Sequence, residues 1–225
     1  MAPPRFRVLS LRHLERDVRL RMPFRFGVVT LTAAPQAFLR ARIRLEDGRE
    51  ADGAAAEMLA PKWFDKNPAI TDDQNFNQLR LSLALAREAY TAREADTAFG
   101  HWLATYRPQI EKGARRGLNS LTACFGPALV DRALLDALCR ACDISFYEAI
   151  RRNLPGIVAP ARETDLTGLD LSAFLAALRP ARDIAARHTV GLVDPISAAD
   201  VTERVNDGLP ETLEDVVARY GPRWF

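Results

Sequence analysis

The chain has 225 residues, enough for one large domain or two small ones. Lys and Arg total 31 against 29 Asp and Glu, a formal net charge of +2, so neither a polybasic nucleic-acid-binding arm nor an acidic tail dominates. With 48% hydrophobic residues, no apolar run long enough to span a membrane, no signal-peptide pattern and only three cysteines, we expect a folded cytoplasmic protein without a disulfide framework. We expect neither nucleic acid nor membrane among its partners.

The first 57 residues predict a three-stranded antiparallel sheet. Residues 36–46 alternate between apolar and charged side chains, the pattern of a strand with one buried and one wet face. The Asp47-Gly48 pair predicts a tight turn, after which residues 49–55 return as the hairpin partner. Shorter alternating runs upstream predict a long first strand, kinked or bulged, in the same sheet. Residues 23–27 are predicted to form a loop between the first two strands.

Helices are predicted over residues 71–153. Thr71 and Gln74 have the spacing of a capping box, and the helix that they open carries an apolar stripe: Phe76, Leu79, Leu83, Ala86 and Tyr90. A second helix, with aromatic residues from Phe99 to Tyr106, is predicted to end near Pro108. A third is predicted from about Pro127 to Cys142.

Two shorter helices follow in the prediction. Ser145 and Glu148 have capping-box spacing and open a helix that ends before Pro155. Residues 170–178 have helical character again. Together these helices form a layer that must bury its apolar stripes against the sheet or against itself.

The C-terminal part predicts a strand followed by a helix. Residues 188–193 form a short, mostly apolar run typical of a buried strand, and residues 211–220 form a helix with Gly221 just past its end. A strand, a helix and the start of a second strand make the first unit of a parallel sheet. Because a parallel strand needs neighbours on both sides, we expect the chain to be the N-terminal portion of a longer protein.

Most chemical motifs have structural explanations. Cys139 and Cys142 have CxxC spacing but lie within a predicted helix, without a second ligand pair for zinc nearby, so two small apolar residues are the favoured interpretation. Of the histidines, only His188 is placed where a site could form, and a structural role is favoured for it too. The sequence contains neither a nucleophile elbow nor a glycine-rich phosphate loop.

Charged and aromatic runs have two interpretations each. Alternating arginines on the second strand face acidic residues on the third, which favours cross-strand ion pairs over a nucleic-acid footprint: Arg40, Arg42 and Arg44 opposite Glu50 and Asp52. The aromatic residues of the 23–27 loop could form a lid over a neighbouring site or pack under the sheet.

Several segments, in order, resemble the N-terminal part of the enolase superfamily, in its mandelate racemase and muconate lactonizing branch. Residues 40–50, with Asp52-Gly53 and Ala60-Pro61, look like the hairpin of the family's capping domain and the loop after it. Residues 130–138 and 145–150 are similar to its long helix and the short helix that follows. Thr189-Val190-Gly191 resembles the first barrel strand, and residues 220–225 look like the approach to the second.

The resemblance implies an α+β fold: an enolase-like capping domain, with a three-stranded antiparallel sheet and a helical layer, followed by the first βα unit of an incomplete (β/α) barrel. The domains would be residues 1–160 and 161–225, with the sheet in 1–57 and the helices in 71–153. In this family the capping domain closes the C-terminal face of the barrel, where the active site lies.

The chemistry implied by the resemblance is abstraction of the proton α to a carboxylate, giving an enediolate held on Mg²⁺. The parent protein would be a racemase, epimerase, cycloisomerase or dehydratase with a small carboxylate substrate, and a homo-oligomer. A lysine of a Lys-x-Lys pair usually acts as base or acid, and carboxylates on later strands hold the metal. We expect that pair immediately after Phe225, so the resemblance places no catalytic and no metal-binding residue in this chain, which we expect to be inactive and to bind no Mg²⁺ itself.

The residues that the resemblance does place here would bind substrate. They are the aromatic loop, the end of the third strand and a position on the first barrel strand: Phe24, Arg25, Phe26, Gly27, Glu57, Met58 and Thr189. The family often has Gly-x-Gly-Glu in the second of these regions, where this chain has residues 52–57 ending in Glu57. The alternative is a non-catalytic helical module that binds a partner.

Overall fold

The computed structural model describes residues 2–158, 166 and 168–225, and the chain forms two compact units. The first comprises Met1–Arg16 and Gln36–Pro180, and the second comprises Asp17–Pro35 and Ala181–Phe225. Each unit is described by itself. The domain boundary predicted between residues 160 and 161 lies outside the described residues.

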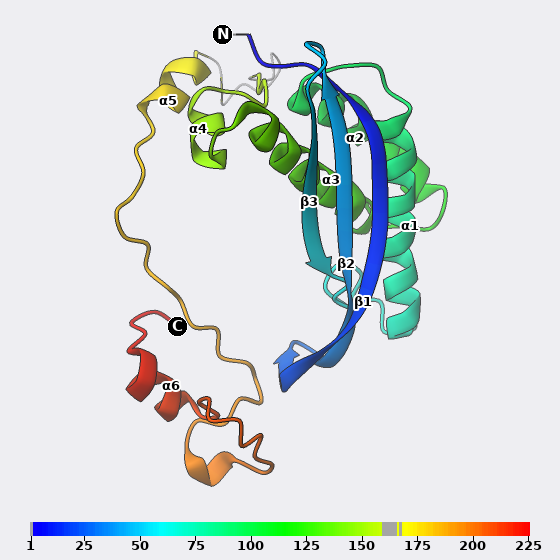
Figure 1. The fold of residues 1–225 in the computed structure, drawn as a ribbon. Coiled ribbons are helices and arrows are strands. Elements are labelled where there is room, and N and C mark those ends of the chain that lie inside the picture. The colour runs from blue at the N-terminus through cyan, green and yellow to red at the C-terminus, as the bar shows by residue number, and fades with distance from the viewer. Residues whose placement is uncertain (1, 159–165, 167) are drawn as a thin grey trace. The chain divides into compact units, whose positions relative to one another are not determined.

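Three strands form one sheet in the order β1-β2-β3 (Figure 1). They are β1 (Phe6–Phe26), β2 (Val29–Leu45) and β3 (Glu50–Met58), and β2 pairs antiparallel with β3 from Gln36↔Met58 to Arg44↔Glu50. The turn predicted at Asp47-Gly48 is confirmed: Gly48 has a φ of +89° and its N–H donates to the Leu45 carbonyl over 3.0 Å. The left-handed φ explains why a glycine stands there.

The long first strand is confirmed, but the loop predicted for residues 23–27 is wrong. Phe24 and Phe26 belong to β1, and the connection to β2 is the two-residue turn Gly27-Val28, with a φ of +54° at Gly27. The two rings stand at alternate positions and are both half-buried, so they follow the strand period after all. Pro23 is tolerated because β1 is an edge strand, where a missing N–H need not break the ladder.

Helix α1 (Asp72–Thr91) begins as predicted. The Thr71 side chain accepts from the Gln74 backbone N–H over 3.2 Å, and the Gln74 side chain accepts in return from the Thr71 N–H over 2.6 Å, which completes the capping box. Four of the five residues of the predicted stripe are buried, and Phe76 packs against the core.

Helix α2 (Ala98–Ala114) passes through Pro108, so the predicted end at this proline is wrong. Pro108 is exposed, and the carbonyl of Ala104, which loses its helical donor, is on a residue that is exposed as well. Water can therefore replace the missing bond, and the helix continues for six residues past the proline.

Helix α3 (Ser120–Cys142) begins seven residues before the predicted start at Pro127. Because Pro127 has no N–H, the buried carbonyl of Ala123 loses its helical partner. Two side chains from other helices replace it: Ser82 Oγ of α1 donates over 2.9 Å and Gln109 Nε2 of α2 over 3.0 Å. The proline is thus accommodated by the packing of three helices, and Asn119, not a residue near Pro127, caps the helix.

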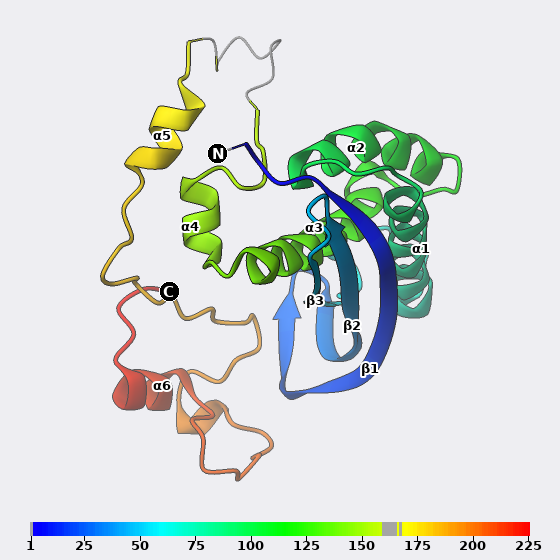
Figure 2. The same ribbon diagram turned by 45° about the horizontal axis from the view of Figure 1, so that its top comes forward.

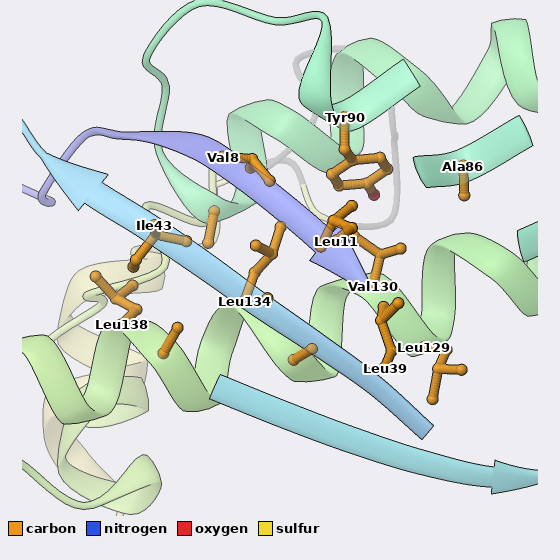
Figure 3. Close-up of a cluster of buried hydrophobic side chains, with 14 of the residues drawn as sticks. Val8, Leu11, Leu39, Ile43, Ala86, Tyr90, Leu129, Val130, Leu134 and Leu138 are labelled. Carbon is orange, nitrogen blue, oxygen red and sulfur yellow. The ribbon is translucent and has the colours of Figure 1, made fainter. Parts of the chain in front are cut away.

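Helices α1, α2 and α3 lie on one face of the sheet and pack against one another (Figures 1 and 2). The apolar face predicted for β2 is buried against them, and the core between sheet and helices includes Leu39 and Ile43 of β2, Tyr90 of α1, and Leu134 and Leu138 of α3 (Figure 3). The predicted helical layer therefore buries its stripes against both the sheet and itself.

Helix α3 lies directly against the backbone of β3 at Gly53. A Cβ atom there would stand 2.2 Å from the Ala137 N and 2.3 Å from the Ala133 O of α3. Asp136 of the same helix accepts from the Ala54 N–H over 2.9 Å, so α3 also satisfies an edge donor of β3. The predicted cross-strand ion pairs are confirmed on the opposite, wet face: Arg40–Asp52, Arg42–Glu50 and Arg44–Glu50 at 3.2, 2.9 and 2.6 Å.

Two short helices complete this unit. Helix α4 (Phe146–Arg151) is capped by Ser145, whose side chain accepts from the Glu148 N–H over 3.1 Å. The reciprocal half of the predicted capping box does not form, since the Glu148 carboxylate pairs with Arg151 and Arg152 instead. Helix α5 (Leu171–Ala177) lies within the range predicted for it and begins after Asp170.

In the second unit, helix α6 (Leu213–Tyr220) ends at Gly221, which has a φ of +56° and is the predicted C-cap. A 3₁₀ turn, Ala198–Asp200, precedes it. The strand predicted for residues 188–193 is wrong. The backbone N–H groups in this segment have different acceptors, Trp224 for His188 and Arg25 for Leu192, so no ladder forms. Among the described residues of this unit, parallel pairing is limited to the single bridge Arg187↔Trp224, and α6 lies between these two residues in the sequence.

Candidate functional site

The end of the β1–β2 hairpin carries four of the seven candidate substrate-binding residues. The rings of Phe24 and Phe26 lie 5.8 Å apart at 36°, while Arg25 and Gly27 are exposed. Because the two rings are only half-buried, part of each ring remains accessible to a partner. This surface, Phe24–Gly27, is called the hairpin tip below.

The hairpin tip contacts the segment that contains Thr189. The Leu192 N–H donates to the Arg25 carbonyl over 3.1 Å. Gly191 is buried, and a Cβ atom there would stand 3.0 Å from Cδ2 of Phe24, so this glycine permits the ring to approach the backbone. Thr189 itself is exposed. The second unit thus brings the hairpin tip and the Thr189 segment together.

Asp194 holds the turn of this segment. Its Oδ2 accepts from the Gly191 N–H over 2.7 Å, and its own N–H donates to the Gly191 carbonyl over 3.2 Å. Since Asp194 bonds to the backbone that contacts Phe24, it orders the side of the hairpin tip that faces residues 188–194.

Glu57 and Met58, the remaining candidates, end β3 in the first unit. The Glu57 carboxylate pairs with Arg132 of α3 at 2.9 Å, and Met58 is half-buried opposite Gln36. The ion pair gives Glu57 a structural partner, and both side chains of that pair are partly exposed. A contribution of these two residues to substrate binding remains a prediction.

A cavity of about 270 Å³ lies within the second unit, next to the residues that follow Thr189. Arg21 closes one side: its guanidinium binds both Asp207 oxygens at 2.5 and 2.6 Å and the carbonyls of Leu209 and Pro210. The bond from Arg21 lowers the pKa of Asp207 to about 2. Arg21 and Asp207 are 186 residues apart, so no local pattern in the sequence indicates this pair.

The same cavity is lined by Glu211, His188 and Asp194 among mainly apolar neighbours. Glu211 is 9% exposed; one of its oxygens accepts from the Asn206 N–H over 2.8 Å, and the other is buried without a partner among the described residues. A buried carboxylate oxygen of this kind can accept a hydrogen bond from a bound molecule. Sequence reasoning placed Glu211 at a helix start and missed its position in this cavity.

Metal ligands are not gathered anywhere in residues 2–158, 166 and 168–225: no group of three or more His, Cys, Asp and Glu side chains is placed to hold an ion. Cys139 and Cys142 lie in the last turn of α3 as free thiols, and burial raises the pKa of both. No helix in the part of the chain that is described is long and apolar enough to cross a bilayer.

No protein-family model and no curated protein matches the chain. Three solved structures are similar to it: an enolase from alpha proteobacterium BAL199 with bound Mg (TM-score 0.44, 16% identity), a substrate-liganded L-Ala-D/L-Glu epimerase from Bacillus subtilis (0.38, 16%), and a protein from Sorangium cellulosum assigned to the mandelate racemase/muconate lactonizing enzymes (0.36, 21%). Each match covers 64% of this chain and 34% of the other, so the chain matches about a third of the length of these proteins.

Proposed function

We propose that the chain is the capping domain and the first part of the barrel of a Mg²⁺-dependent enzyme that removes the proton α to a substrate carboxylate. The reaction would be a racemisation, epimerisation, cycloisomerisation or dehydration of a small carboxylate. The domains would divide near residue 160, and the catalytic lysine pair and the metal ligands would follow Phe225.

One observation carries this proposal: the hairpin tip and residues 181–225 form one compact unit. Within it, the Arg25 carbonyl accepts from the Leu192 N–H, and the bridge Arg187↔Trp224 is parallel with α6 as its connection. A hairpin that contacts the segment before a helix, with a parallel bridge across that helix, is compatible with a capping domain whose hairpin tip lies at the active-site face of a barrel. The order of the sequence segments gives independent support.

The residues of the tip would then exclude water from the reacting centre. Phe24 and Phe26 supply apolar surface, and desolvation strengthens the electrostatic contacts that stabilise an enediolate. Arg25 is exposed and supplies a cation that a substrate carboxylate can bind. Thr189 supplies a hydroxyl at the start of the barrel. A substrate-binding role for Glu57 and Met58 is proposed from the sequence resemblance alone. The Mg²⁺ would supply the charge that holds the enediolate.

The test is exchange of the α-proton with solvent, which every reaction of this class shares. The protein is expressed from its natural gene with a tag at the N-terminus, so that any residues encoded after Phe225 are included. It is then incubated in D₂O with Mg²⁺ and hydroxy acids, sugar acids, N-acyl amino acids or dipeptides. We expect the α-proton signal of at least one substrate to disappear in the ¹H NMR spectrum, and EDTA to prevent it.

Variants of the hairpin tip separate a role in catalysis from one in folding. Phe24→Ala is expected to lower kcat/KM about tenfold or more, whereas Val28→Ala, at a side chain that is 87% exposed in the same turn, should leave it unchanged. If no carboxylate exchanges its α-proton, the proposal fails and a partner-binding module becomes the better explanation. Exchange by residues 1–225 alone would refute the placement of the catalytic groups beyond this chain.

A further inference from the structure

A second cavity, of about 290 Å³, lies wholly within the first unit, between α2, α3, α4 and the residues after α4. Its lining is apolar except for one carboxyl group, Asp131 of α3, and includes Phe99 and Trp102 of α2, Ile150 of α4 and Pro155. This group is called the α2–α3 cleft below. A volume near 300 Å³ is at the lower end of the range for small-molecule sites, which suits a ligand of one or two rings.

The walls of the α2–α3 cleft are tied together. The Phe99 N–H at the start of α2 donates to the Pro155 carbonyl over 2.9 Å, which joins α2 to the segment after α4. Thr97 caps α2 next to this bond by accepting from the Gly100 N–H over 3.0 Å. The rings of Phe99 and Trp102 lie 5.3 Å apart and are half-buried, so they present one aromatic wall to a ligand.

Asp131 is the single charged residue among these apolar walls. The Tyr90 hydroxyl donates to its Oδ1 over 2.7 Å, and in the described residues nothing else donates to this carboxyl group. Burial raises the pKa of Asp131 to about 7, and the hydrogen bond from Tyr90 offsets only part of this rise. No ion pair to Asp131 is found among the residues that the structure describes, and the cleft beside it offers space for a cation.

We propose that the α2–α3 cleft binds a small aralkyl amine, whose ammonium group pairs with Asp131 while its ring packs against Phe99 and Trp102. Charge complementarity selects the occupant: a carboxylate ligand would meet a like charge, whereas an ammonium group completes the hydrogen bonding of Asp131. The two aromatic rings favour a flat, apolar body and add cation–π attraction for the amine. Binding here does not involve the hairpin tip, so it is separable from the activity proposed above.

Isothermal titration calorimetry with the complete chain tests this inference. The probes are tryptamine and tryptophol, which share an indole ring and differ in an ammonium against a hydroxyl group. At pH 8 we expect saturable one-site binding of tryptamine and at least tenfold weaker binding of tryptophol, the difference typical of a charge-assisted hydrogen bond at a partly buried site. Equal affinity for the two probes, or no binding of tryptamine, would refute the proposal.

Three variants locate the site. Asp131→Asn keeps an acceptor for Tyr90 but removes the charge, and is expected to weaken tryptamine binding at least tenfold without changing the affinity for tryptophol. Ile150→Phe fills the cleft and is expected to reduce binding of both probes. Asp143→Asn, at an exposed residue in the C-cap of the same helix, is the matched control and should bind tryptamine like the parent. Undiminished tryptamine binding by Asp131→Asn would show that the amine binds elsewhere.

Discussion

Replacement of Gly53 by alanine should destabilise the first unit strongly, because α3 lies directly on the backbone of β3 at this point. The added Cβ atom would stand 2.2 Å from the Ala137 N and 2.3 Å from the Ala133 O, where 3.4 Å is the lower limit of ordinary contact. Both neighbours are backbone atoms in the middle of a helix, so they cannot rotate away. The helix must therefore move from the strand by about 1 Å.

The expected loss is about 3 kcal/mol in the free energy of unfolding. Overpacking in a well-packed core typically costs 1–3 kcal/mol, and the upper end of that range applies where the obstructing atoms belong to the backbone. Moving α3 also lengthens the bond from the Ala54 N–H to Asp136, which is 2.9 Å in the structure. Restriction of the unfolded chain by Gly→Ala favours folding by only about 0.4–1 kcal/mol, so the net sign stays unfavourable.

Urea denaturation followed by circular dichroism at 222 nm measures this change. If the variant and the parent have the same m-value, the shift in the denaturation midpoint reports the change in the free energy of unfolding. The control is Ala56→Val on the same strand, since Ala56 is exposed and an added side chain meets no helix there; it should alter stability by no more than about 0.5 kcal/mol. A Gly53→Ala variant as stable as the parent would refute the close contact between α3 and β3.

Three further changes test other parts of the first unit. Gln109→Leu removes a buried donor to the Ala123 and Ser82 carbonyls, both at 3.0 Å, and should lower the free energy of unfolding in urea by about 1–3 kcal/mol. The loss should exceed that of the control Gln78→Leu, at a half-buried position. Thr71→Ala removes the side-chain half of the α1 capping box and should cost about 1 kcal/mol, with Thr91→Ala at the other end of the helix as the comparison. Because the pKa of Asp131 in the fold, about 7, exceeds its ordinary 3.8, the stability that its protonated form provides is complete below about pH 4 and is lost as pH rises through 7. Asp131→Asn should therefore be more stable than the parent by about 4 kcal/mol at pH 8 and by little at pH 4, and a difference that does not depend on pH would contradict the burial of that charge.

Periodicity alone predicted the elements whose partners are close in sequence. The alternation over residues 36–46 assigns the buried face of β2 correctly, because a strand with one wet face must separate apolar from charged side chains. The capping box at Thr71 is local too, since its two hydrogen bonds join residues three positions apart. The β2–β3 hairpin needs only the short connection of residues 46–49, with a left-handed glycine at Gly48. Local physics determines these features.

The prolines show where such reasoning stops. A proline within a helical pattern indicates an end or a start, and residue-level analysis placed boundaries at Pro108 and Pro127. In the structure the cost at Pro127 is met by Ser82 and Gln109, which are 41 and 14 residues from the Ala123 carbonyl. Whether a helix tolerates a proline thus depends on donors that only the packed fold brings near, and these donors carry no sequence signal of their own.

The candidate site also depends on contacts between segments that are far apart in the sequence. The sequence predicted a substrate-binding role for Phe24 and Thr189 through a resemblance, but the contact between their segments depends on the Arg25 carbonyl, the Leu192 N–H and the absence of a side chain at Gly191. Two of these are backbone groups, which every residue possesses, so side-chain patterns cannot reveal them.

Asp131 is missed for a related reason: in the sequence of α3 it is one more polar position beside an apolar stripe. Its significance comes from Tyr90, 41 residues away on α1, and from the aromatic wall of α2. Together they place the carboxyl group in an apolar cleft, where no side chain of the described residues forms an ion pair with it.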